Sequence, residues 1–277
     1  MKEPDKSAPG DALTPFEQAL RDRVPSREAL LAEAKAQTRR QRQRKQALGG
    51  TLSALLLASA VWFFDPSLYS DDVHVAIGSR EDLDLADGSQ VMLNSGTRLR
   101  IEHRLRSRQF ELLEGEATFT VVHGPQPFTV RSQGVAVRDI GTRFNVRSDS
   151  RGVAVAVVEG EVEVSSAALT PKRLHGGQQV LASERQAGPV TAVDPLRAIA
   201  WQQGKLRFDG TPLQEVIVDL QRYREAPIRL ADNSVGNLRL SGEFDSDAVE
   251  PLLDLLPSIL PINLSRAADG TVLIRGR

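Results

Sequence analysis

Hydrophobic and polar residues follow several different patterns along the chain. From residue 14 to 46, apolar side chains recur at helical spacing among many charges, and the next eighteen residues, Ala47 to Phe64, carry no charge. Between residues 73 and 182, apolar and polar residues alternate in short runs separated by turns. From residue 201 onward, helical and alternating segments succeed one another. These patterns predict an α+β multi-domain chain: a helical segment, an apolar helix, an all-β domain and a small α/β domain.

The first 46 residues predict a thin pair of helices. Thr14 can cap the first helix and Pro15 suits its first turn, and Pro25-Ser26 separates it from the second. The apolar faces are narrow, so we expect this segment to fold against a partner. The residues that form these faces are Phe16, Leu20, Leu30 and Leu31.

The uncharged run over 47–64 is close to the shortest helix that can cross a membrane. Five cations lie between Arg39 and Lys45, just before it, and three aspartates follow it. Because cations flank the cytoplasmic end of a span, the pattern predicts one transmembrane helix, with residues 1–46 in the cytoplasm and residues 65–277 on the opposite side of the membrane. A buried core helix and a signal peptide cleaved near Ala58-Ser59-Ala60 are the alternatives.

Residues 70–183 predict an all-β domain that is solenoid-like or sandwich-like. Asp87-Gly88, Glu114-Gly115-Glu116 and Glu159-Gly160-Glu161 indicate turns, and an alternating run follows each of them. The segments LLEGEATFTV and VVEGEVEVSS form a weak internal repeat with a spacing of 45 residues. We interpret the paired glutamates as solvated turn residues rather than as an acid–base dyad.

After a linker over 184–200, residues 201–277 predict a small α/β domain of βαββαβ type. Thr211-Pro212 indicates a helix start, because threonine can cap a helix and proline suits its first position. A second helix is expected to begin at Ser246 or Asp247. The apolar face of the first helix consists of Leu213, Val216, Ile217, Leu220 and Tyr223.

The amino-acid composition excludes several kinds of functional site. Lys and Arg total 35 and Asp and Glu total 36, so the net charge of −1 does not favour direct binding of nucleic acid. The chain has no cysteine, which excludes disulfides, thiolate zinc sites and a cysteine nucleophile. It also contains no Walker loop, dinucleotide fingerprint, metal-type histidine spacing or Gly-x-Ser-x-Gly elbow. We therefore expect no cofactor, no metal and no turnover enzyme.

The dipeptide Gly141-Thr142 is a candidate site for a reaction within the chain itself. Thr142 places a hydroxyl next to the carbonyl of Gly141, and such a hydroxyl can attack that carbonyl in an N-to-O acyl shift that yields a hydrolysable ester. Glycine makes a strained backbone inexpensive at this position. From the residues alone, an ordinary Gly-Thr at a strand edge is the simpler interpretation.

The order of the motifs resembles the FecR-like regulators of cell-surface signalling in Gram-negative bacteria. The resemblance covers residues 70–277, and its C-terminal part resembles the short domain shared by secretins and TonB-dependent receptors. The segments that carry it are Asp87-Gly88-Ser89, Leu93-Asn94, Gly115-Glu116-Ala117, Pro127-Phe128-Thr129-Val130, Gly141-Thr142-x-Phe144-x-Val146, Val158-Glu159-Gly160, Gly176-Gly177, Trp201, Gly204, Thr211-Pro212-Leu213 and Gly242.

This resemblance implies an anti-sigma factor in the inner membrane, with residues 65–277 in the periplasm, that relays a signal to an extracytoplasmic-function sigma factor. The signal would come from the signalling domain of a TonB-dependent outer-membrane receptor for a siderophore or haem, which would dock on residues 201–277 through an edge strand or the helix region from Leu213 to Tyr223. The resemblance also implies self-cleavage at Gly141-Thr142, followed by a site-2 intramembrane protease. The 46-residue N-terminal segment is shorter than is usual in the family and lacks tryptophan. A membrane-tethered scaffold for an envelope secretin or transporter is the alternative function.

Overall fold

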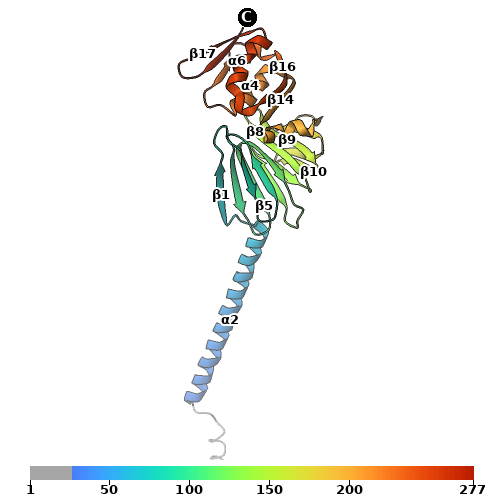
Figure 1. The fold of residues 1–277 in the computed structure, drawn as a ribbon. Helices are drawn as coiled ribbons and strands as arrows, with labels where there is room; N and C mark the ends of the chain where they lie inside the picture. Colours follow the sequence, from blue (N-terminus) through green and yellow to red (C-terminus); the bar gives the residue numbers. More distant parts are fainter. Residues whose placement is uncertain (1–26) are drawn as a thin grey trace, which may run out of the picture. The chain divides into compact units, whose positions relative to one another are not determined.

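The computed structural model describes residues 27–277, which fall into two compact units divided after Phe64 (Figure 1). The helix predicted around Phe16 and Leu20 lies outside the described residues. The described part of the first unit is a single continuous helix, α2 (Arg27–Phe64). Leu30 and Leu31 lie on this helix and are 50% and 54% exposed.

The predicted transmembrane helix over 47–64 is wrong. Among the described residues, no helix has both the length and the apolar character that crossing a membrane requires. The absence of charge is a weaker property than apolarity, because the run also contains two glycines, two serines and a threonine. The predicted separation of a cytoplasmic helical segment from a second, apolar helix is likewise replaced by one helix, α2.

The second unit, Asp65–Arg277, is mostly β. Its largest element is a sheet of thirteen strands. These are β1 (Tyr69–His74), β2 (Glu81–Asp84), β3 (Gln90–Leu93), β4 (Arg98–His103), β5 (Arg108–Thr120), β6 (Phe128–Ser132), β7 (Val135–Asp139), β8 (Arg143–Asp149), β9 (Gly152–Glu159), β10 (Glu161–Ser166), β11 (Leu169–His175), β12 (Gln178–Ala182) and β13 (Thr191–Ala192).

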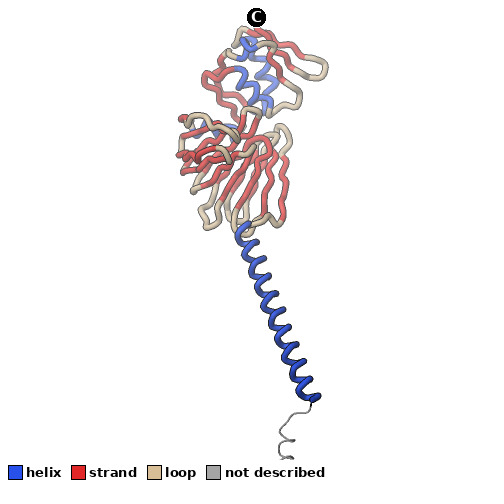
Figure 2. Tube along the Cα trace, turned by 180° about the vertical axis from the view of Figure 1, so that it is seen from behind, coloured by secondary structure: helices blue, strands red, loops and turns tan. Residues whose placement is uncertain are grey.

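The long strand β5 organises this sheet. The main path runs β11-β10-β7-β6-β5-β8-β9-β12-β13. Strands β3 and β4 also pair with β5; β2 pairs with β3, and β1 pairs with β4. The first half of β5 pairs with β4 and β6, and its second half pairs with β3 and β8. Because one strand serves two sets of neighbours, the sheet curls into a half-barrel rather than the predicted solenoid or sandwich (Figure 2).

Gly115 lies inside β5 and not in a turn, contrary to the sequence prediction. Its φ is +93°, and a Cβ at this position would lie 2.5 Å from the Cα of Thr97, so only glycine fits. The β4–β5 register shifts beside it. Gly160, in the second copy of the weak repeat, instead separates β9 from β10. The two similar segments therefore have different structures.

The thirteen-stranded sheet carries an apolar core. The largest side chains in it are phenylalanines, and the rings of Phe119 and Phe144 are stacked with their centroids 5.3 Å apart. Phe128 stacks on Phe110 at 4.6 Å. All four rings are at most 4% exposed. Removal of this apolar surface from water is the main contribution to the stability of such a domain.

The remaining chain forms short helices and two small sheets. In order, these are α3 (Pro195–Ala198), η1 (Ala200–Gln203), β14 (Lys205–Pro212), α4 (Leu213–Gln221), β15 (Ile228–Leu230), α5 (Asn233–Gly236), β16 (Arg239–Asp245), η2 (Ser246–Ala248), α6 (Val249–Ile259), β17 (Ile262–Arg266) and β18 (Val272–Gly276). The sheets are β14-β16 and β15-β18-β17. A second apolar core lies between them and the helices α4 and α6.

The start of α4 differs from the prediction. Pro212, the last residue of β14, is the capping residue and makes no side-chain cap hydrogen bond, while Thr211 lies inside β14. The Thr211 hydroxyl accepts a hydrogen bond from Arg197 Nη2 at 3.0 Å and is therefore used elsewhere. Residues 65–277 form one compact unit, so the predicted boundaries at 183 and 201 stay a prediction.

Candidate functional site

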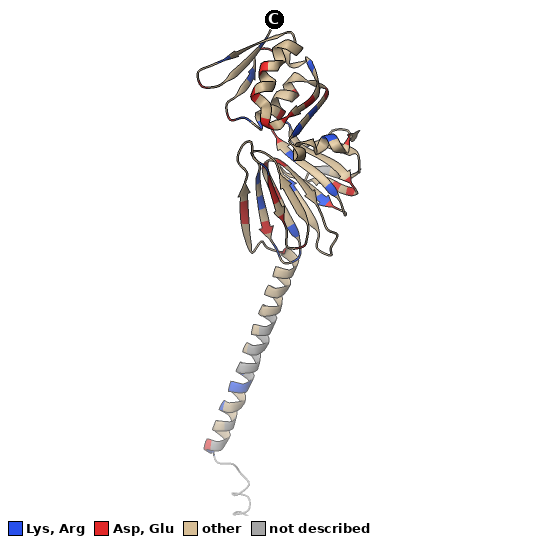
Figure 3. Cartoon of the chain, in the orientation of Figure 1, with Lys and Arg blue, Asp and Glu red and all other residues tan. Residues whose placement is uncertain are grey.

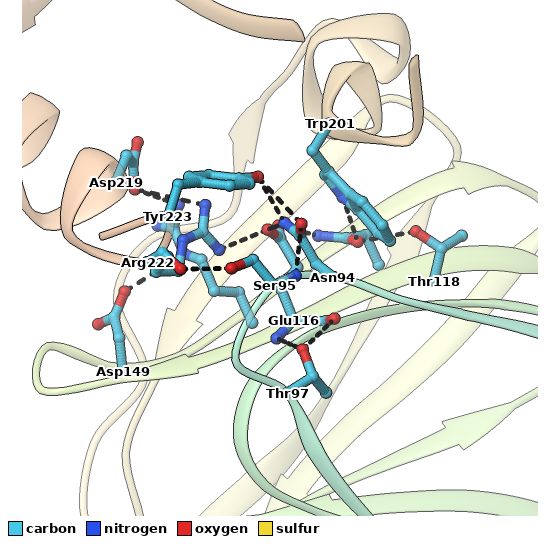
Figure 4. Close-up of polar contacts among 12 residues, drawn as sticks. Asn94, Ser95, Thr97, Glu116, Thr118, Asp149, Trp201, Asp219, Arg222 and Tyr223 are labelled. Atoms are coloured by element: carbon cyan, nitrogen blue, oxygen red, sulfur yellow. Dashed lines mark hydrogen bonds and ion pairs between the residues drawn. The ribbon is translucent and has the colours of Figure 1, made fainter. Parts of the chain in front are cut away.

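A cluster of buried polar side chains joins the thirteen-stranded sheet to the segment that follows α4 (Figure 4). We call it the polar interlock. On the sheet side it draws on β5, β8 and the loop after β3, and on the other side on η1 and the residues after α4. Its members are Asn94, Ser95, Glu116, Asn145, Trp201, Arg222 and Tyr223.

An ion pair between Glu116 and Arg222 lies at its centre. Glu116 is 4% exposed, and its Oε2 accepts a hydrogen bond from Arg222 Nη1. Asn94 Nδ2 donates to the same oxygen at 2.8 Å, and Asn145 Nδ2 donates to Oε1 at 2.8 Å. Both carboxylate oxygens are therefore satisfied without water, which is the condition under which a buried charge is tolerated.

The electrostatics keep Arg222 charged. Burial on its own would lower the pKa of this guanidinium, but the negative charges of Glu116 and Asp219 outweigh it and raise that pKa. Asp219 is in turn shared with two arginines of the sheet, Arg147 at 3.1 Å and Arg151 at 3.4 Å. The segment around α4 is thus held to the sheet by several pairs of opposite charge.

Tyr223 adds a neutral contact. Its hydroxyl donates to Asn94 Oδ1 at 3.0 Å and accepts from Asn94 Nδ2 at 2.8 Å, and burial raises the pKa of Tyr223 to about 12. Beside it, Ser95 Oγ donates to the backbone carbonyl of Arg222. The chain just after α4 is therefore fixed through both side chains and backbone.

Trp201 covers the part of the polar interlock around Asn145. It is 4% exposed, and its indole Nε1 donates to Asn145 Oδ1 at 3.2 Å. Thr118 Oγ1 donates to the same oxygen at 2.8 Å. Arg80 Nη1 donates to the carbonyl of Trp201 at 2.9 Å. The polar side chains Glu116, Thr118 and Asn145 on β5 and β8 are thereby covered.

A cleft of about 660 Å³ lies next to the polar interlock. Its lining carries both signs of charge, and Figure 3 likewise shows both signs mixed along the strands. Within residues 27–277 no group of three or more His, Asp or Glu side chains is arranged to hold a metal ion. The arrangement is suited to holding two parts of the chain together.

The second candidate site is the corner between β7 and β8, which we call the Gly141 corner and which comprises Asp139, Gly141, Thr142 and Gly160. Gly141 is exposed with a φ of +99°, and Thr142 is 6% exposed. The carboxylate of Asp139 accepts hydrogen bonds from Gly141 N at 2.9 Å and from Thr142 Oγ1. The predicted reacting residues are therefore adjacent to a carboxylate that sequence reasoning did not assign.

The predicted partner-contact residues have different environments. Leu30 and Leu31 are exposed on α2. Along α4, the four predicted apolar residues are at most 7% exposed and belong to the second core, and Tyr223 belongs to the polar interlock. A contact with a partner through the region of α4 stays a prediction. The buried residues are Leu213, Val216, Ile217 and Leu220.

Sequence reasoning missed Glu116 and Arg222. Alternation places Glu116 and Thr118 on the opposite face of β5 from Ala117 and Phe119, and a polar face is normally expected to contact water. Here both faces are buried, because Trp201 and Arg222 cover the polar one. The one sequence signal was the Gly-Glu-Ala segment within the family resemblance.

Comparisons with known proteins match most of this second unit. Residues 71–163 match the family model described as FecR protein, and residues 205–274 match the one described as FecR, C-terminal. Two crystal structures of a candidate anti-sigma factor from Parabacteroides distasonis are similar, each with 29% identity and a TM-score of 0.66. They cover 76% and 75% of this chain and 100% and 99% of their own. Among curated proteins, no sequence matches the chain significantly.

Proposed function

The chain belongs to the FecR protein family, and from this we propose that it is an anti-sigma factor that regulates an extracytoplasmic-function sigma factor. The similarity to the candidate anti-sigma factor of Parabacteroides distasonis carries the proposal, because it extends over the whole of that crystallised chain and over 76% of this one.

The sigma factor binds the N-terminal segment in this proposal. Leu30 and Leu31 offer an apolar contact on α2, each about half exposed, and Phe16 and Leu20 extend the apolar pattern in the sequence. An amphipathic helix that lays its apolar residues in a groove of a partner is a common mode of recognition. Residues 1–46 carry 11 basic and 7 acidic side chains, so their net charge of +4 favours an acidic partner surface.

The signal arrives at residues 201–277, from the signalling domain of a TonB-dependent receptor for a siderophore or haem. The apolar face of α4 is buried, so the open edges of the small sheets are the better candidates for the contact. The strands β15 and β17 each pair with β18 on one side only, and β14 and β16 pair only with each other. An unpaired strand edge can accept a strand from a partner.

Self-cleavage between Gly141 and Thr142 prepares the chain for release of the sigma factor. The cut separates β1–β7 from β8–β18, yet β5 pairs with β8 and β7 pairs with β10 across it. Glu116 and Arg222 also lie on opposite sides of the cut. Receptor binding would separate the halves, and the N-terminal fragment would then be degraded by a protease.

The proposal is tested by co-purification of the full chain with the sigma factor encoded beside it. We expect a complex that Leu30→Asp with Leu31→Asp disrupts, because charges replace the apolar contact. Gln37→Ala, also exposed on α2, is the matched control and should bind like the unaltered chain. Failure of the unaltered chain to bind this sigma factor would refute the function. For the receptor, hydrogen exchange of the full chain should show new amide protection at an edge strand within 201–277, and protection confined to the large sheet would contradict that part.

A further inference from the structure

The two residues of the proposed self-cleavage share one hydrogen-bond partner. Asp139 ends β7, and its carboxylate accepts a hydrogen bond from the hydroxyl of Thr142 and another from the amide of Gly141. We propose that Asp139 is the catalytic base of an acyl shift at the Gly141-Thr142 bond. This inference rests on the proposed self-cleavage and assigns the group that makes it possible.

The nucleophile is oriented and shielded at the Gly141 corner. Thr142 Oγ1 donates to Asp139 Oδ1, and the residue is 6% exposed, so water competes poorly for the hydroxyl proton. The carbonyl of Thr142 accepts a hydrogen bond from Val121 N at 3.0 Å, which fixes the backbone on the far side of the scissile bond. A base within hydrogen-bond reach of the proton that it removes is the first geometric requirement of general base catalysis.

The scissile carbonyl is held by close packing. Asp139 Oδ2 accepts the Gly141 amide at 2.9 Å, in a conformation with a φ of +99° that favours glycine. The carbonyl oxygen of Gly141 points at Gly160, where an added Cβ would lie 2.3 Å from it and 2.7 Å from Thr142 Cγ2. Glycine at both positions therefore lets the carbonyl and the threonine pack against the same backbone, which restricts their mutual orientation.

The chemistry balances with water as the only co-reactant. Asp139 takes the hydroxyl proton while Thr142 Oγ1 bonds to the carbonyl carbon of Gly141. The bond from that carbon to Thr142 N then breaks, and the proton passes from Asp139 to the departing nitrogen, which leaves an ester and a free amine. Water next hydrolyses the ester to a Gly141 carboxylate and restores the threonine hydroxyl.

Water has access to the site for the second step. A cleft of about 350 Å³ lies beside the corner, and Asp139, Gly141 and His123 are part of its lining. Glu163 lines the same cleft, and its nearest ion-pair partner is Arg173 at 3.9 Å. It offers a second carboxylate in the same surroundings that is not bonded to the threonine, and is therefore a matched control.

The test follows cleavage of the purified full chain over time by gel electrophoresis and mass spectrometry. We expect Asp139→Asn to slow cleavage by about 100-fold or more, because the amide can still accept from Gly141 N but cannot take the proton. Glu163→Gln should cleave at the unaltered rate. Asp139→Ala should regain part of its rate in formate, which fits the cleft and replaces the base. Unchanged thermal unfolding of Asp139→Asn would show that folding is retained.

Each outcome separates this inference from the function on which it rests. Asp139→Asn that cleaves at the unaltered rate would overturn the role of Asp139 while self-cleavage stands. Asp139→Ala that formate does not accelerate would also overturn it, because a merely structural carboxylate gives that result. An unaltered chain that stays whole for days, and stays whole in hydroxylamine, would overturn both self-cleavage and this inference, whereas binding of the sigma factor would still be judged by co-purification.

Discussion

Arg222 and Glu116 form a buried ion pair across 106 positions of the sequence. Glu116 lies in the centre of β5, and Arg222 follows α4. Because the two also lie on opposite sides of the proposed cut, the pair connects the future fragments as well as the sheet and the C-terminal segment. Its strength bears on stability and on the proposed separation of the two fragments.

Replacement of Glu116 by alanine should strongly destabilise the protein. It leaves the guanidinium of Arg222 buried without its main partner, a change that costs about 3–5 kcal/mol in other proteins. The free energy of unfolding from urea titration measures this cost. Glu114→Ala is the matched control, because Glu114 is an exposed partner of Arg98 at 2.7 Å in the same strand and such pairs contribute about 1 kcal/mol or less. Equal losses for the two variants would contradict the central role of the interlock.

Unfolding should depend on alkaline pH through Tyr223. Its pKa in the folded protein is raised to about 12 from a usual value of 10.0, so the folded state binds more protons than the unfolded state between these values. Stability should therefore be full below pH 10 and fall as the pH rises toward about 12, by roughly 3 kcal/mol in all.

Urea titrations between pH 8 and pH 12 measure this effect. Tyr223→Phe should remove most of the decline, because the titrating hydroxyl is absent. The chain has two tyrosines, and the other, Tyr69, is 58% exposed, so Tyr69→Phe provides a matched control that should retain the decline. A decline that survives in Tyr223→Phe would show that other groups cause it.

Two glycines with positive φ should respond differently to alanine. At Gly115 the added Cβ would meet Thr97 at 2.5 Å, and at Gly78 nothing lies within 4 Å. In Gly78→Ala the added methyl group meets no other atom, so the only cost is that of a positive φ for alanine, about 1–2 kcal/mol of folding free energy. Gly115→Ala must also displace β4, and we expect it to lower the melting temperature considerably more. Similar melting temperatures for the two variants would contradict the close packing inside β5.

Local patterns predicted local structure in this chain. Asp87-Gly88 was expected to be a turn, and it lies between β2 and β3. The four residues Leu213, Val216, Ile217 and Leu220 were expected on one apolar face, and they are buried in the second core. In each of these places, the preference of a few neighbouring residues coincides with the demands of the fold.

Contacts between distant residues were not predictable in the same way. Glu116 was interpreted as a solvated turn residue because nothing near it in the sequence signals Arg222. Thr211 was expected to cap α4, but it bonds to Arg197 instead. Asp139 is two residues from Gly141, yet its role depends on the corner that β7 and β8 form. Uncharged residues before Asp65 suggested a membrane span that the described helices do not contain.

Cleaved protein should remain a single particle until it is denatured. Once the bond after Gly141 is cut, fragments 1–141 and 142–277 still share the β5–β8 ladder from Gly115 to Thr120 and the β7–β10 ladder from Val135 to Asp139. The phenylalanine core also spans the cut, since Phe119 stacks on Phe144. Burial of this apolar surface does not depend on the covalent bond.

Native size-exclusion chromatography of the cleaved chain should therefore give one peak that contains both fragments, and increasing urea should split it. Glu116→Ala should lower the urea concentration at which the fragments separate, because the ion pair with Arg222 joins them directly. Glu114→Ala pairs with Arg98, on the same side of the cut, and should separate at the unaltered concentration. If the fragments of the unaltered chain separate without denaturant, cleavage alone would release the N-terminal part, and no pull from a receptor would be needed.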